Sequence, residues 1–67
     1  MGKKKIDGYV FVTYVGDHRP YHVHIYYRDR ELGRFDIENQ TPLDKHLVLS
    51  GKLRNALKEG GYLKNDD

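Results

Sequence analysis

The chain has 67 residues, which suffices for one small domain but leaves little room for a large enclosed active site. It contains no cysteine, so disulfide bridges and thiolate metal sites are excluded. The net charge is +2, yet without the lysines at 3–5 the count is 9 basic against 10 acidic residues. We therefore predict a single domain, residues 1–67, whose folded part is nearly neutral.

The N-terminus, residues 1–7, reads as a basic tail that contacts phosphates or only aids solubility. No apolar run follows the lysines, so neither a signal peptide nor a membrane span is expected. The default localisation is therefore cytoplasmic, with no membrane partner.

Three strands are expected next along the chain. Residues 9–15 are aromatic and β-branched and apolar on both faces of a strand, which suggests neighbours or a partner on both sides. Residues 21–27 alternate, as a half-buried strand does, and residues 32–38 alternate again. Asp29-Arg30 lies between these two runs, so a hairpin is the natural connection.

A helix is expected after the third strand. Thr41 as N-cap, Pro42 at the first helical position and Asp44 three residues after the cap form a start signal. From residue 43 to residue 59 the apolar side chains fall on one side of a helical wheel, with only Val48 misplaced.

Two further features of this segment have structural interpretations. Gly60-Gly61 should end the helix, and Tyr62 should fold back onto its last turn. His46 lies on the apolar face, so we expect a packed, neutral histidine. Residues 64–67 should fray.

The predicted fold class is α+β: a three-stranded antiparallel meander with one C-terminal helix packed on one face, in the order β-β-β-α. The residues expected to face the helix are Val23, Ile25, Phe35 and Ile37. The residues expected to face outward are His22, His24, Tyr26, Arg34 and Asp36.

The outward histidines suggest RNA chemistry. A histidine with an ordinary pKa of about 6.5 can take a proton from a ribose 2′-hydroxyl, while arginine stabilises charge on the phosphate. Aromatic side chains can stack on unpaired bases, with or without cleavage. The candidate catalytic residues are His22, His24 and His18; the nucleic-acid contacts are Arg19, Arg34, Tyr21 and Tyr26, with Tyr14 as a further stacking residue; Asp36 would orient an imidazole.

Three other interpretations stay open. His-x-His on a strand places two imidazoles on one face, so His18, His22 and His24, with Asp17 or Asp36, could bind zinc or a similar divalent metal; no cofactor is otherwise expected. The sheet face or the first strand could instead dock a partner protein or a second copy. The histidines could also be ordinary strand residues that pair with carboxylates across the sheet.

The stretch Asp17, His18, Pro20, His22, His24, followed by Asp36-Ile37-Glu38, resembles the small bacterial domain-of-unknown-function family 4160. This resemblance covers about residues 8–38 and implies a short bacterial or phage-associated protein, often encoded beside another small gene as in toxin–antitoxin pairs. It implies no particular activity.

Gly16-Asp17-His18 and the segment 58–63 are similar to HicA-type mRNA interferase toxins, although the leading helix of those toxins has no counterpart here. Together these features predict a toxin–antitoxin-like or mobile-element protein that binds or cleaves RNA, with a small cognate protein or a homodimer as further partners.

Overall fold

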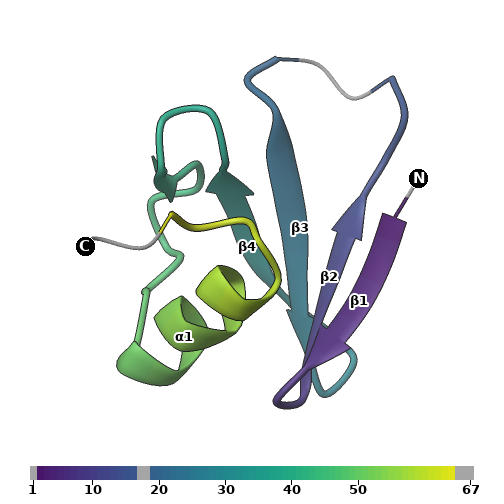
Figure 1. Ribbon diagram of the computed structural model, residues 1–67, viewed down its shortest axis with the longest axis vertical. Helices are drawn as coiled ribbons and strands as arrows, with labels where there is room; N and C mark the ends of the chain where they lie inside the picture. Colours follow the sequence, from purple (N-terminus) through teal and green to yellow (C-terminus); the bar gives the residue numbers. More distant parts are fainter. Residues whose placement is uncertain (1, 17–18, 65–67) are drawn as a thin grey trace.

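The computed structural model describes residues 2–16 and 19–64. One antiparallel sheet, with its strands in chain order, has a helix across one face (Figure 1). Its elements are β1 (Gly2–Ile6), β2 (Tyr9–Thr13), β3 (His22–Tyr27), β4 (Arg30–Asp36), β5 (Thr41–Pro42) and α1 (Gly51–Glu59). The predicted α+β meander with one C-terminal helix is confirmed, but the sheet has five strands where the sequence predicted three.

The first correction concerns the N-terminus, which is a strand and not a tail over residues 2–6. β1 pairs with β2 along its whole length, from Gly2 opposite Thr13 to Ile6 opposite Tyr9. Asp7 and Gly8 connect the two strands with φ values of 52° and 88°, the backbone of a two-residue hairpin turn. Ile6 packs against the core, so the strand is held by more than its hydrogen bonds.

The second hairpin joins β3 to β4 through Arg28 and Asp29, whose φ values are 51° and 64°. The turn therefore lies one residue earlier than predicted, and β4 covers residues 30–36 instead of 32–38. A bulge between Ile25 and Tyr26 shifts the register, so Tyr26 lies opposite Glu31.

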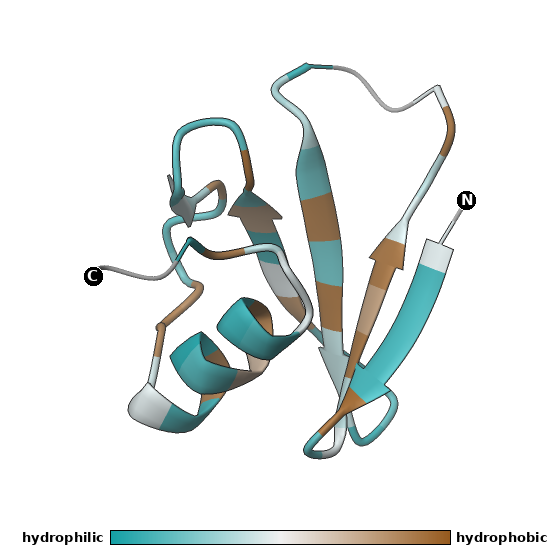
Figure 2. Cartoon of the chain, viewed as in Figure 1, coloured by the Kyte–Doolittle hydropathy of each residue, from teal (hydrophilic) through white to brown (hydrophobic). Residues whose placement is uncertain are grey.

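The core lies between the sheet and α1. β3 alternates between apolar and polar residues along its length (Figure 2). Its apolar residues Val23 and Ile25 are buried in the same cluster as Leu53, Ala56 and Leu57 of α1. Residues with no exposed surface come from three strands and the helix: Phe11, Val23, Ile25, Phe35, Ala56 and Leu57. Of the predicted helix-facing residues, Val23, Ile25 and Phe35 are thus fully buried, and Ile37 packs against the cluster.

The second correction concerns where the helix begins. Thr41 and Pro42 pair with β4 as β5, and the N-cap is Ser50, whose Oγ accepts the Leu53 backbone N–H at 3.2 Å. Residues 43–50 form turns and irregular backbone between the two elements. Consequently Val48 is 78% exposed and His46 is exposed, so the prediction of a packed His46 is wrong.

The predicted helix stop is confirmed. Gly61 has a φ of +85°, and the backbone N–H groups of Gly61 and Tyr62 donate to the carbonyls of Lys58 and Leu57, the two bonds of a Schellman motif. Tyr62 is buried against Phe11, with ring centroids 5.3 Å apart. Over the described residues, α1 is too short and too polar for a helix that crosses a bilayer.

Candidate functional site

The sheet face opposite α1, here called the open face, carries all the outward residues that alternation predicted. Its members are Lys3, Lys5, Val10, Val12, Tyr14, His22, His24, Tyr26, Arg34 and Asp36.

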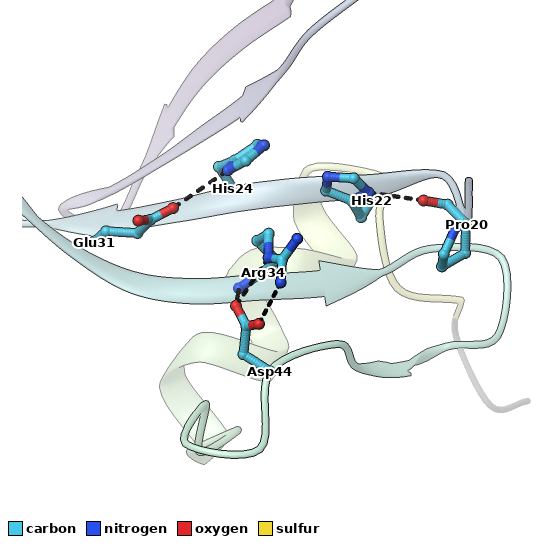
Figure 3. Close-up of polar contacts among 6 residues, drawn as sticks. All are labelled: Pro20, His22, His24, Glu31, Arg34 and Asp44. Carbon is cyan, nitrogen blue, oxygen red and sulfur yellow. Dashed lines mark hydrogen bonds and ion pairs between the residues drawn. The ribbon is translucent and has the colours of Figure 1, made fainter. Parts of the chain in front are cut away.

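The two strand histidines are the centre of this face. Both imidazoles project from the same side of β3, and their ring centroids lie 5.1 Å apart (Figure 3). Val23, between them, is fully buried on the side of α1. The predicted common face of His22 and His24 is therefore confirmed, whereas Asp17 and His18 lie outside the described residues.

His22 is the less accessible of the two histidines. Only 6% of the residue is exposed, and its Nδ1 lies 2.7 Å from the Pro20 carbonyl oxygen (Figure 3). A carbonyl can only accept, so Nδ1 carries the proton and Nε2 carries the lone pair of the neutral ring. This geometry fixes the entry of the chain into β3.

His24 is more accessible and is held between a carboxylate and a phenol ring. Its Nδ1 lies 3.2 Å from Glu31 Oε2, so Nδ1 donates to the ionised carboxylate and Nε2 is again the basic nitrogen of the neutral ring. The Tyr14 ring meets the imidazole edge-on, with centroids 5.0 Å apart. Of the two strand histidines, His24 is the one positioned to meet a ligand.

Asp36, predicted to orient an imidazole, lies opposite His22 in the β3–β4 register. Its carboxylate bonds mainly to the turn that follows β4. Its two oxygens accept the backbone and side-chain N–H groups of Asn39 at 3.0 and 2.8 Å. These bonds are the main cause of its lowered pKa, to which the nearby His22 adds. Asp36 therefore closes the turn after β4.

Arg34, predicted to contact phosphate, forms a two-pronged ion pair with Asp44 (Figure 3). Its Nη2 and Nε donate to the two carboxylate oxygens at 2.6 and 3.1 Å, and its backbone N–H donates to the same carboxylate at 2.9 Å. The hydrogen bonds from Arg34 also lower the pKa of Asp44. Arg34 thus fastens the segment after β5 to the sheet.

Arg19, the other predicted phosphate contact, differs from Arg34 in its exposure. It donates to Glu38 Oε1 at 2.9 Å, and 89% of its side chain is exposed. A pair this exposed contributes little to stability, so Arg19 can exchange its partner for a phosphate at small cost.

The tyrosines divide between the two faces of the sheet. Tyr26 and Tyr14 lie on the open face and share a hydrogen bond, which is the main cause of the raised pKa of Tyr26. Tyr21 precedes β3 and lies on the α1 side of the sheet, near Tyr62. Burial is the main cause of the raised pKa of Tyr62, and the nearby Tyr21 adds to it. The structure therefore brings Tyr14 and Tyr26, but not Tyr21, together with the histidines.

A shallow hollow of about 450 Å³ lies on the open face. It is lined by Lys3, Val10, Val12, Tyr14, Tyr26 and Asp29. Sequence reasoning did not place Lys3 or Asp29 on the sheet face, although it allowed the basic N-terminus to contact phosphates. Two hairpin turns would have indicated both residues. Recognition of Asp7-Gly8 as a turn predicts that the lysine run is a strand, and a turn at Arg28-Asp29 places Asp29 at the end of the sheet.

Within residues 2–16 and 19–64, no group of three or more His, Asp or Glu side chains is arranged to hold a metal ion. The metal hypothesis was built on His22 and His24, and two of its candidate third ligands, Asp17 and His18, lie outside this part of the chain.

Comparisons with protein-family models, with curated proteins and with solved structures found no match to this chain. They therefore leave both family resemblances as expectations.

Proposed function

We propose that the protein binds single-stranded RNA on the open face. The observation that supports this proposal is a continuous row of rings, Tyr26, Tyr14, His24 and His22, beside the exposed lysines of β1. Proteins that bind single strands combine ring surfaces for base stacking with cations that follow the phosphates.

Lysines of β1 supply the positive charge that this mode of binding requires. Lys3 lies opposite Val12 and Lys5 opposite Val10 in the β1–β2 register, so both project over the open face. Neither forms an ion pair with any described residue. Lys4, which alternates to the other side, instead donates to the Gly60 carbonyl at 3.0 Å.

The stacking surface is tested by fluorescence anisotropy with a labelled eight-nucleotide single-stranded RNA. Tyr14→Ala should weaken binding by about 1–3 kcal/mol, the usual contribution of one stacked base. Tyr21→Ala is the matched control, because Tyr21 and Tyr14 are 52% and 42% exposed but lie on opposite faces. Equal effects of the two substitutions would contradict the placement of RNA on the open face.

The lysine contacts are tested by the salt dependence of the same binding. Each phosphate contact to a single strand adds about 0.7 to the slope of log affinity against log salt concentration. Lys3→Ala and Lys5→Ala should each reduce the slope by about this amount. Lys45→Ala, an exposed lysine after β5, should leave it unchanged. An unchanged slope in the β1 variants would remove them from the interface.

RNA cleavage is a second candidate function, favoured by the fixed tautomers of the two neighbouring histidines. In each neutral ring Nε2 carries the lone pair, and His24, whose side chain is 17% exposed, is the more accessible of the two candidates for the general base toward a 2′-hydroxyl. His24→Ala should abolish cleavage of labelled RNA in buffer with EDTA, whereas His46→Ala, an exposed histidine elsewhere, should cleave normally. Cleavage by the His24 variant at the normal rate would exclude this role.

The toxin–antitoxin-like or mobile-element setting that both resemblances imply belongs to the same proposal. In that setting a small cognate protein would mask the open face and block RNA. Competition between this partner and labelled RNA is the direct measurement.

A further inference from the structure

The hollow on the open face has the composition of a binding site for a single base. Val10 and Val12 give it an apolar floor, and Tyr14 and Tyr26 stand beside them. Its volume of about 450 Å³ lies within the range of roughly 300–1,000 Å³ that is usual for ligand sites. Lys3 on one side supplies a cation for the phosphate of a bound nucleotide.

The hollow also contains one carboxylate. Asp29 is exposed in the β3–β4 turn, where its positive φ of 64° follows that of Arg28, and it lines the hollow from that end. Among the described residues it has no ion pair, although Arg28 and Arg30 flank it in sequence. Its oxygens are therefore available to accept hydrogen bonds from a ligand.

A carboxylate only accepts hydrogen bonds, so it selects the base that offers it donors. On the Watson–Crick edge guanine offers two adjacent donors, N1–H and the N2 amine, which match the two oxygens of a carboxylate. Adenine and cytosine offer one amine beside an acceptor nitrogen, and uracil offers one N–H between two carbonyls. Guanine is therefore the base that pairs with Asp29 through two bonds.

We propose, as an extension of the RNA-binding function above, that this hollow holds a guanine of single-stranded RNA and that Asp29 is the residue that selects it. Lys5 and Arg28 line a neighbouring hollow that shares Val10 and Asp29 with the first. Cations therefore lie on both sides of Asp29: Lys3 in the first hollow, and Lys5 and Arg28 in the second. Either set can contact the phosphate next to the selected guanine.

The test compares five labelled pentanucleotides that differ only in the central base: UUGUU, UUAUU, UUCUU, UUUUU and the inosine form. The wild-type protein should bind the guanine form about tenfold more tightly than the adenine, cytosine and uracil forms. Inosine lacks the N2 amine, so its affinity should fall between these.

Asp29→Asn keeps the size of the side chain and tolerates the positive φ, but it replaces one acceptor by a donor. This variant should lose the preference for guanine and favour adenine or cytosine, whose amine beside an acceptor nitrogen matches the acceptor and donor of asparagine. Asp7→Asn is the matched control, since Asp7 has a φ of 52° in the β1–β2 turn and does not line the hollow. This control should keep the full preference for guanine.

The outcomes separate the two proposals. Absence of binding to every pentanucleotide and to the eight-nucleotide RNA would overturn the RNA-binding function itself. Equal wild-type binding of all five bases, or a guanine preference that Asp29→Asn retains, would overturn only the selection by Asp29.

Discussion

Replacement of Asp44 by asparagine tests whether the Arg34–Asp44 pair holds the segment after β5 on the sheet. The substitution preserves the shape of the side chain and one oxygen that can still accept the Arg34 backbone N–H. It removes the charge that receives the guanidinium bonds at 2.6 and 3.1 Å.

The structure sets the size of the effect. Hydrogen bonds to a charged group contribute about 1.5–3 kcal/mol, and partial exposure reduces this figure. The side chains of Arg34 and Asp44 are 41% and 20% exposed, so we expect Asp44→Asn to lower the free energy of unfolding by about 2 kcal/mol. For a domain of this size that is a fall in Tm of about 8–15 °C.

The matched control is Glu38→Gln, which removes the carboxylate from the Arg19 pair at 2.9 Å. The Arg19 side chain is 89% exposed, so this change should cost at most about 0.5 kcal/mol. Urea unfolding followed by circular dichroism measures both variants. An equal loss of stability in the two variants would refute the conclusion that the Arg34–Asp44 pair is a structural clamp.

The same comparison has a pH dependence of known sign. Arg34 lowers the pKa of Asp44 in the folded protein below its ordinary value of 3.8. The wild-type advantage over Asp44→Asn is therefore complete well above that value and is lost as the pH falls below it through the folded pKa. An advantage that stays the same from neutral pH down to the lowest pH at which both proteins fold would mean that the charge of Asp44 contributes nothing.

Two further predictions concern elements that anchor the open face. Deletion of residues 1–7 should strongly destabilise the protein, because Ile6 packs on the core; a melting temperature equal to that of the full chain would mean that β1 is dispensable. Gly60→Ala should lower the free energy of unfolding by about 1–3 kcal/mol, since a Cβ there would lie 2.8 Å from the Tyr62 ring. Gly51→Ala meets nothing within 4 Å and should be neutral or stabilising, and urea unfolding compares the pair.

The alternation of β3 was the most informative pattern in the sequence. A strand with valine and isoleucine at every second position must place His22 and His24 together on the other face, and the structure agrees. The burial of His22 was not predictable in the same way. In the structure its ring packs against His24 and bonds to the Pro20 carbonyl at the entry to the strand, contacts that alternation alone does not predict.

The two errors in the fold both concern strand pairing between chain neighbours: in one a helix-start signal was overruled by pairing with β4, and in the other a hairpin turn was not recognised. Thr41-Pro42 has the chemistry of a helix start, yet pairing with β4 and the grip of Arg34 on Asp44 keep these residues extended. The lysine run looks like a solvated tail. Its alternation with Ile6 becomes visible only once Asp7-Gly8 is recognised as a hairpin turn.

The proposed binding site therefore differs from the one that the sequence predicted. The sequence predicted that Arg34 contacts phosphate and that Asp36 orients an imidazole. In the structure Arg34 instead pairs with Asp44, and Asp36 bonds to Asn39. The side chains left to meet a ligand lie on the β1–β2 side of the histidines, where Lys3 borders an apolar hollow. A ligand that fits there must offer a flat apolar surface and a negative charge together, and a nucleotide has both. This match is the physical basis of the RNA-binding proposal.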